Sequence, residues 1–229
     1  LRDPQLGKDV FVPGNDDPAN REVVVLHESS GYAVRVSDEF GRPLSRAAIA
    51  TALATVLEDG PHSDPPFTAP AYLAGTDAAR HFSEGLRVPG NADTYARLGD
   101  ALFFINLISE DRPLAIHMEQ AAFGAEQAWP FKPVTLQVGL ADDFVGLHIE
   151  HSMMDGATVQ SVIGRAQEVP DDEPEDLTES AGESATESAT GSAGESLAAV
   201  PAERLRWNLR PGAAQRLHRA IERYERAAS

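Results

Sequence analysis

The sequence contains no cysteine. Disulfides, thiolate zinc sites and a cysteine nucleophile are therefore excluded, and a reducing, cytoplasmic location is expected. No apolar run approaches the roughly 18 residues that a membrane-spanning helix needs, and no signal peptide is visible. The first residue is Leu1 rather than methionine, so the visible start need not be the start of translation.

Basic residues are also few. The 229 residues include 19 Lys and Arg against 36 Asp and Glu, which gives a formal net charge of −17. A chain this acidic repels nucleic-acid phosphates and anionic lipids, so neither is an expected partner. Hydrophobic residues make up 42% of the chain, an ordinary share for a globular protein.

The acidity is concentrated in one segment, residues 167–199. Between Gln167 and Leu197 the sequence has ten acidic residues, no Lys or Arg and no aromatic residue. Removing these ten charges leaves a net charge of about −7, an unremarkable value. Such a composition cannot bury enough apolar surface to offset its ordering entropy. We therefore predict a disordered acidic linker over 167–199. An acidic docking segment is the alternative, and salt adaptation would also account for the overall acidity.

The remaining residues, 1–166 and 200–229, predict an α/β domain in which helices flank a mixed sheet. Two apolar runs, Val23–Leu26 and Tyr32–Val36, are joined through "HESSG" and predict a hairpin. Residues 132–140 and 144–152 alternate between apolar and polar and predict two further strands. One short strand and one amphipathic helix are expected after the acidic segment.

Helices are predicted where apolar residues recur at helical spacing, over 46–59, 77–86, 93–107 and 156–169. Ser45 precedes the first of these helices and is expected to cap it. The third helix would place Tyr95, Leu98, Leu102 and Ile105 on one stripe.

The stretch "VGLHIEHSMMDGATVQ", residues 145–160, holds the candidate site. His151 follows a predicted strand, at a point where a rigid element ends and opens to solvent. An imidazole exchanges a proton near neutral pH, and a nearby carboxylate can fix its tautomer. Asp155 is close enough in a tight turn to do so, and Gly156 would let the backbone bend sharply. The alternative is a strand-end histidine followed by an aspartate that only caps a helix.

The other histidines show no metal-ligand spacing and are expected on the surface or in packing: 27, 62, 81, 117, 148 and 218. No metal site is therefore predicted. His148 lies one strand period from Glu150 and near His151, so a secondary role is open to it.

A pattern "HxxxDG" after a strand resembles the chloramphenicol acetyltransferase-like superfamily, which includes peptide-synthetase condensation domains. Condensation domains have a second histidine directly before the catalytic one, whereas Glu150 stands there in this sequence. The run "EHS", with Asp155 four residues after His151, instead resembles the choline/carnitine acyltransferases.

Other stretches resemble that family in the same order: "REVVVLHESSGYAVRVSDEFGRPLS", "DALFFINL", "AWPFKPVTLQVGLADDFVGLHIEHSMMDG" and "LRWNLRPGAAQRLHRAIERYE". Together they cover nearly all of the chain except the acidic linker. Two positions depart from the family pattern. Ala128 precedes Trp129 where the family has arginine, and Phe131 precedes Lys132 where the family has aspartate.

The resemblance implies a chloramphenicol acetyltransferase-like domain that is apparently partial. Residues 1–166 would form the part with the catalytic histidine, and 200–229 a strand and helix leading to a second domain absent here. That second domain carries the coenzyme A contacts in the family, so the coenzyme-binding residues are unknown. The rest of such an enzyme, in the same or another chain, is therefore an expected partner. The isolated chain is expected to be inactive and to bind coenzyme A weakly, because its basic residues are scattered apart from the last helix.

The resemblance also implies a chemistry, transfer of an acyl group between coenzyme A and carnitine, choline or a similar alcohol. His151 would act as general base, and Asp155 would orient it or pin its loop. Glu150, Ser152 and Gly156 would support them. No cofactor is implied, since the coenzyme A thioester is a substrate. A condensation-type acyltransferase on a carrier-bound thioester and a non-catalytic module of the same fold are the alternatives.

Overall fold

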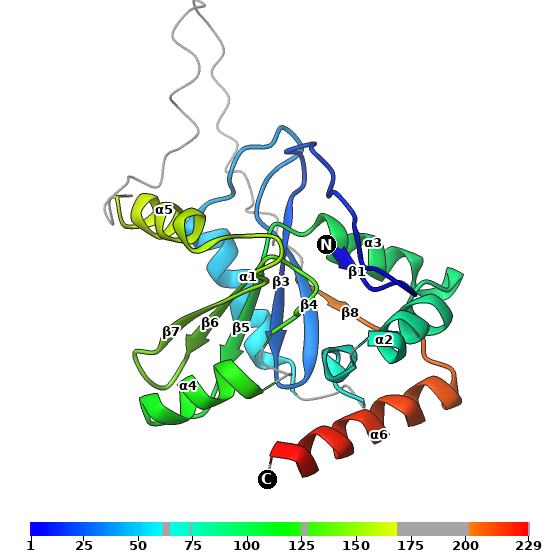
Figure 1. Cartoon of the computed structure of the whole chain (residues 1–229). Helices are drawn as coiled ribbons and strands as arrows, with labels where there is room; N and C mark the ends of the chain where they lie inside the picture. The colour runs from blue at the N-terminus through cyan, green and yellow to red at the C-terminus, as the bar shows by residue number, and fades with distance from the viewer. Residues whose placement is uncertain (61–64, 74, 125–127, 169–201, 229) are drawn as a thin grey trace, which may run out of the picture.

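The computed structural model describes residues 1–60, 65–73, 75–124, 128–168 and 202–228. Within these residues, helices flank a six-stranded mixed sheet, so the predicted α/β class is confirmed (Figure 1). The predicted acidic linker lies outside the described residues except for its first two positions. Gln167 ends a helix and Glu168 caps it, so the helix runs into the segment predicted as linker.

The sheet has the strand order β7-β6-β5-β3-β4-β8. Its strands, in chain order, are β3 (Glu22–His27), β4 (Ser30–Arg35), β5 (Phe104–Ile108), β6 (Val134–Gly139), β7 (Val145–Ile149) and β8 (Ala202–Leu205). The central strands β3, β5 and β6 are parallel, whereas β4, β7 and β8 each pair antiparallel with a neighbour. A separate two-stranded ribbon is formed by β1 (Arg2–Asp3) and β2 (Val10–Phe11).

The predicted hairpin is β3–β4, and its turn is tight. Glu28 and Ser29 have φ angles of 42° and 68°, the left-handed pair of a two-residue hairpin whose twist matches the strands. Gly31 follows at a close approach, because a Cβ there would lie 2.5 Å from Phe67 Cδ1. The hairpin prediction is confirmed, with His27 and Ser30 belonging to the strands rather than to the loop.

The α-helices are α1 (Arg46–Glu58), α2 (Gly75–His81), α3 (Ala92–Asp100), α4 (Leu114–Phe123), α5 (Gly156–Gln167) and α6 (Pro211–Ala228). Short helical turns are η1 (Ala69–Tyr72), η2 (Phe82–Leu86) and η3 (Pro89–Asn91). Ser45 caps α1 as predicted, because its Oγ accepts a hydrogen bond from Ala48 N at 3.2 Å. No helix was predicted from the sequence over the residues of α4. Every helix among the described residues is too short or too polar to cross a bilayer.

The predicted helix over 93–107 is wrong beyond Asp100. There α3 ends, and Phe104–Ile108 forms β5 in the middle of the sheet, between β3 and β6. Phe104 is fully buried. Leu107 and Ile108, which point to opposite faces of the sheet, are only 9% and 6% exposed. A strand covered on both faces is apolar throughout and carries no alternation. The helical spacing of Leu102 and Ile105 is therefore coincidental.

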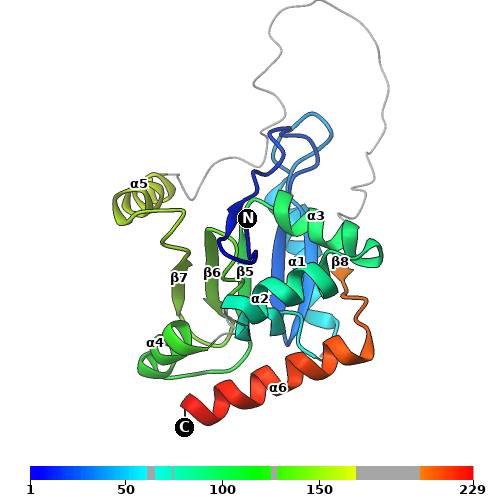
Figure 2. The ribbon, with the colours of Figure 1, turned by 45° about the vertical axis from the view of Figure 1, so that its right-hand side comes forward.

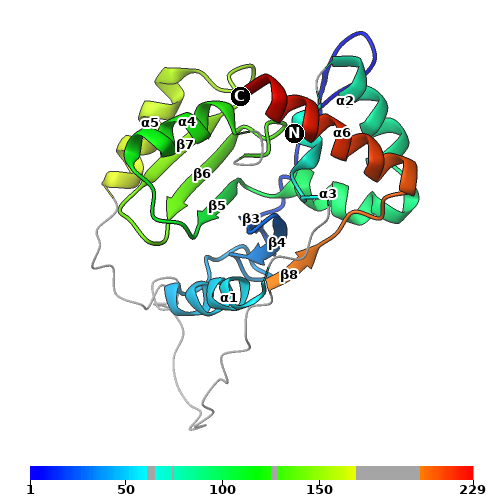
Figure 3. The same ribbon diagram turned by 90° about the horizontal axis from the view of Figure 1, so that it is seen from below.

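Helices cover both faces of the sheet (Figure 3). Val56 and Ala52 of α1 pack on one face against Val23, Val25 and Val34. The opposite face holds an aromatic core with Trp129 at its centre, closed by residues of η2 and α3. Figures 1 and 2 place α5 at the β7 end of the sheet, apart from α2, α3 and α6.

The segment after residue 201 returns to the sheet. Ala202–Leu205 forms β8 on the edge of β4, slightly earlier than the "LRWNL" stretch that suggested a strand. Trp207 then stacks on Phe67 at 5.2 Å between ring centroids. The following helix, α6, buries Leu217 and Ala220 against Ala69, Leu73 and Ala78.

Candidate active site

The turn between β6 and β7 is held by one carboxylate. Asp142 Oδ1 accepts a hydrogen bond from Phe144 N at 3.0 Å, and Oδ2 accepts one from Arg112 N at 3.2 Å. His117 Nε2 lies 2.7 Å from Asp142 Oδ2, and the His117 ring stacks on Phe144 with centroids 3.9 Å apart. The hydrogen bond from His117, followed by that from Phe144 N, holds the pKa of Asp142 below its usual range. The hairpin that leads to the candidate site therefore has a fixed turn.

His151 lies in the turn that follows β7, as the sequence predicts. Glu150 N closes the strand by donating to Pro133 O at 3.0 Å, and Met153 N donates to Glu150 O at 2.9 Å. The side chain of His151 is exposed, and within the described residues it makes no hydrogen bond or ion pair. The imidazole is thus held by backbone geometry at a strand end and is open to a second molecule. We expect this open side of His151 to form the mouth of a cleft or channel in the active enzyme, and that stays a prediction.

Asp155 is engaged with the helix rather than hydrogen-bonded to His151. It is the N-cap of α5, and its Oδ1 accepts a hydrogen bond from Thr158 N at 2.7 Å. The backbone and side-chain hydrogen bonds of Thr158 lower the pKa of Asp155, and the charge of His151 adds a smaller contribution. Of the two roles that the sequence leaves open, this geometry fits pinning of the loop. His151 and Asp155 remain within electrostatic reach of each other.

Replacing Asp155 by alanine is expected to destabilise the fold at neutral pH, because Thr158 N then loses its acceptor. The folded-state pKa of Asp155 lies below its ordinary value of 3.8. Its contribution is therefore complete above that value and disappears as the pH falls through the lower folded-state pKa. Urea unfolding of both proteins between pH 7 and pH 3 should show the difference shrinking in acid. Asp143→Ala, which removes an exposed carboxylate from the β6–β7 turn, is the matched control. An equal loss at all pH values would contradict the capping role.

Glu150 ties the turn that carries His151 to the N-terminal segment. Its Oε1 accepts hydrogen bonds from Ser152 N at 3.1 Å and Ser152 Oγ at 2.7 Å, and its Oε2 lies 3.0 Å from Arg2 Nη2. The two residues therefore brace the backbone around His151. Gly156 was expected to let the backbone bend sharply, but it is the first residue of α5 and its φ is not left-handed. A Cβ at this position would meet nothing within 4 Å. An alanine would fit the conformation of Gly156.

A row of polar side chains crosses β7, β6 and β5 beside the turn that carries His151. His148 is paired with Thr135 of β6, and directly paired residues share one face of a sheet. Two residues further along β6, Gln137 is paired with Asn106 of β5. Thr135 is fully buried, and its Oγ1 has no hydrogen-bond partner within the described residues. The alternation in 132–140 predicts the apolar face of this strand, and its polar face gives no separate signal in the sequence.

The segment before β6 is anchored by two residues of the family-like motif. Lys132 is buried, and its Nζ donates to Gly99 O at 2.6 Å and Leu98 O at 3.2 Å. Burial is the main cause that lowers the pKa of Lys132 to about 8. Trp129 is fully buried, and Phe131 packs edge-to-face on Phe82 at 4.6 Å. The departure at Phe131 therefore belongs to the aromatic core.

The remaining histidines behave mainly as packing residues. Three of those in the described chain are buried, at 5%, 1% and 2% exposure for His27, His81 and His117. His62 lies outside the described residues. In the described part of the chain, no three or more side chains of His, Asp or Glu are grouped so that they could hold a metal ion.

The whole chain, residues 1–229, matches the sequence model of the family described as Choline/Carnitine o-acyltransferase. No curated protein matches the chain. The match covers β7, the turn with His151 and the cap at Asp155, together with the Trp129 core and the C-terminal strand and helix. The fold class is that of the chloramphenicol acetyltransferase-like proteins, and the chain belongs to the choline/carnitine O-acyltransferase family.

Proposed function

We propose that this chain carries the proton-transfer histidine of an O-acyltransferase that moves acyl groups between coenzyme A and carnitine, choline or a similar alcohol. The observation that supports this proposal is the position of His151 in the turn directly after β7, where its imidazole has no hydrogen-bond partner in the described chain and is free to exchange a proton. Membership of the family supports the reaction type. The proposal calls for no metal or redox cofactor, since the coenzyme A thioester is itself a substrate.

In transfer to the alcohol, His151 accepts the hydroxyl proton while the oxygen attacks the thioester carbonyl carbon. A carbon–oxygen bond forms, and the tetrahedral intermediate collapses as the carbon–sulfur bond breaks. The departing thiolate takes the proton from the imidazolium. In the reverse direction His151 deprotonates the coenzyme A thiol. Neither direction needs a covalent acyl-enzyme. Asp155 and Glu150 act on this chemistry through the loop that they brace.

A second candidate is a module of the same fold without turnover of its own. It is favoured by the exposure of His151 and by the engagement of Asp155 with α5. A reaction centre open to water loses most of the electrostatic stabilisation that an enclosed site provides. We therefore propose that this chain alone turns over slowly or not at all. The remaining substrate contacts would come from another part of the enzyme or from another chain.

Thiol release from acetyl-coenzyme A separates these candidates. The 229-residue chain is incubated with carnitine, with choline or without an alcohol. The incubations are repeated after addition of the C-terminal half of a choline/carnitine acyltransferase as a separate polypeptide. We expect release that depends on the alcohol and rises on complementation. Release that is independent of any alcohol would contradict acyl transfer, and no release under any condition would favour the non-catalytic module.

A further inference from the structure

The last helix presents a row of arginines next to its buried flank. Leu217 and Ala220 of α6 are buried against η1 and α2. Arg216, Arg219 and Arg223 follow one another at spacings of three and four residues, so they share one side of the helix. From the sequence alone, this helix is the one place where basic residues cluster. The arginines are indeed exposed, but they also line a cavity.

The cavity lies between α2 and α6 and has a volume of about 380 Å³. Five arginines line it, namely Arg80, Arg216, Arg219, Arg223 and Arg226. The only carboxylates in its lining are those of Asp77 and Glu222, so the lining carries three more positive than negative charges. This excess of positive charge occurs in a chain with a formal net charge of −17. We call this cavity the α2–α6 groove.

Three of the five groove arginines, Arg80, Arg219 and Arg223, are weakly neutralised within the described residues. Arg223 Nη2 lies 3.6 Å from Asp77 Oδ2, and both side chains are more than half exposed. Exposed pairs of this kind contribute little free energy. Arg80 and Arg219 make no ion pair within the described residues. Their guanidinium groups are therefore available to an anion from solution.

A buried histidine lines the same groove. His81 is 1% exposed, and neither of its ring nitrogens has a hydrogen-bond partner within the described residues. Burial, followed by the charge of Arg216, lowers the pKa of His81 to about 4. At neutral pH the ring is uncharged and offers one N–H donor. A buried polar group without a partner is costly and is rare in folded proteins, so an oxygen atom of a ligand would complete its hydrogen bonding.

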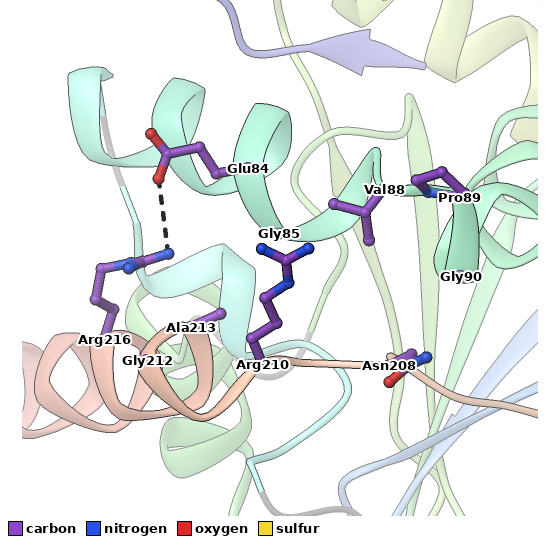
Figure 4. Close-up of a pocket in the computed structure, with 10 residues that line it drawn as sticks. All are labelled: Glu84, Gly85, Val88, Pro89, Gly90, Asn208, Arg210, Gly212, Ala213 and Arg216. Carbon is purple, nitrogen blue, oxygen red and sulfur yellow. Dashed lines mark ion pairs between the residues drawn. The ribbon is translucent and has the colours of Figure 1, made fainter.

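Arg216 also lines a second cavity, which extends the groove toward the N-terminus of α6. This cavity has a volume of about 710 Å³ and includes Arg210 and Asn208. Figure 4 shows Arg210 reaching toward Gly85, with Arg216 beside Glu84. The N-terminus of a helix adds backbone N–H groups and the positive end of the helix dipole. Both cavities therefore carry an excess of positive charge beside α6.

We propose that the α2–α6 groove binds a small phosphate-bearing anion, held by Arg80, Arg216 and Arg219 and by an N–H donated from His81. Planar guanidinium groups match phosphate oxygens in pairs, and such charge-assisted hydrogen bonds are the stronger kind in proteins. The groove is separate from His151, because α5 and α6 lie at opposite ends of the molecule in Figures 1 and 2. The inference therefore goes beyond acyl transfer and does not depend on it.

Inorganic pyrophosphate is the probe. We expect calorimetric titration of the chain, with sodium chloride adjusted to keep the ionic strength constant, to show one saturable site. Arg219→Gln should weaken binding about tenfold, the typical effect of losing one charge-assisted hydrogen bond. Arg206→Gln is the matched control, because Arg206 is exposed and lines neither cavity. In protein labelled with ¹⁵N-histidine, the ring resonances of His81 should shift on saturation.

Three results would overturn the proposal: no saturable binding at constant ionic strength, equal weakening by Arg206→Gln and Arg219→Gln, or unmoved His81 resonances. A further titration distinguishes the source of the phosphate. If coenzyme A displaces pyrophosphate and pantetheine does not, the groove takes the phosphates of the coenzyme. If neither displaces it, the groove takes a different phosphorylated molecule. Both results support an anion site, and both are independent of any measurement of turnover.

Discussion

Replacing His151 by alanine is expected to lower the rate of acyl transfer by about 10²–10⁴-fold, the range that general acid–base catalysis contributes. Without the imidazole, the attacking hydroxyl keeps its proton until water removes it, and the departing thiolate has no acid beside it. Both kcat and kcat/KM should fall together, since the lost interaction is made in the transition state. Thiol release from acyl-coenzyme A, measured in the active assembly, checks this expectation.

The fold should survive this change. The His151 side chain is exposed and has no hydrogen bond in the described chain, so the melting temperature of the variant should stay close to that of the wild type. His148→Ala is the matched control, because it removes a second imidazole three residues before His151, from within β7. It is expected to reduce transfer less. Near-normal turnover by His151→Ala, or an equal loss in both variants, would remove His151 from its role as general base.

Replacing Trp129 by alanine is expected to lower the free energy of unfolding by about 3–5 kcal/mol, the usual cost of truncating a buried aromatic side chain. Trp129 is fully buried, and its ring lies 5.5 Å from that of Phe131 and about 6 Å from those of Phe67, Phe82 and Trp207. The cavity left behind would open at the centre of the core on that face of the sheet. Urea unfolding followed by far-ultraviolet circular dichroism measures the loss.

Two further variants make this prediction specific. Trp129→Phe should cost less, because the indole Nε1 is buried without a hydrogen-bond partner in the described chain and no hydrogen bond is lost. Trp207→Ala should also cost less than Trp129→Ala, since Trp207 is only partly buried, although it loses the hydrogen bond from Nε1 to Phe67 O at 3.0 Å. A loss for Trp129→Ala no larger than that for Trp207→Ala would show that the aromatic core is not centred on Trp129.

Strands and helices were predictable where a turn, an alternation or a capping residue marks them. The β3–β4 hairpin, the β6–β7 hairpin and the cap at Ser45 each leave a local signal in the sequence. The central strand β5 does not, because Phe104–Ile108 is covered on both faces and its apolar residues fit a helical spacing as well as a strand. Its assignment depends on pairing with residues about 30 and 80 positions away, which short-range patterns do not contain.

The candidate site was predictable in position but not in contacts. The alternation up to Ile149 and the "DG" pair are enough to place His151 at a strand end. The capping role of Asp155 was one of two open alternatives, because a carboxylate four residues after a histidine can turn toward either partner. The arginines of α6 were visible as a basic helix. Their juxtaposition with His81 was not, because α2 and α6 are more than a hundred residues apart in the sequence.

The fixed turn at Asp142 determines which face of the sheet each side chain of β7 points to. Side chains on a strand alternate between two faces, so a one-residue shift between β6 and β7 would exchange His148 and Glu150 for Leu147 and Ile149. A shift of two residues would keep the faces but move His151 along the strand by about 7 Å. The hydrogen bonds that Asp142 makes with Phe144 N, Arg112 N and His117 therefore fix the register of β7 on β6 and, with it, the position of His151. An insertion or deletion in this turn would therefore displace His151 without changing that residue.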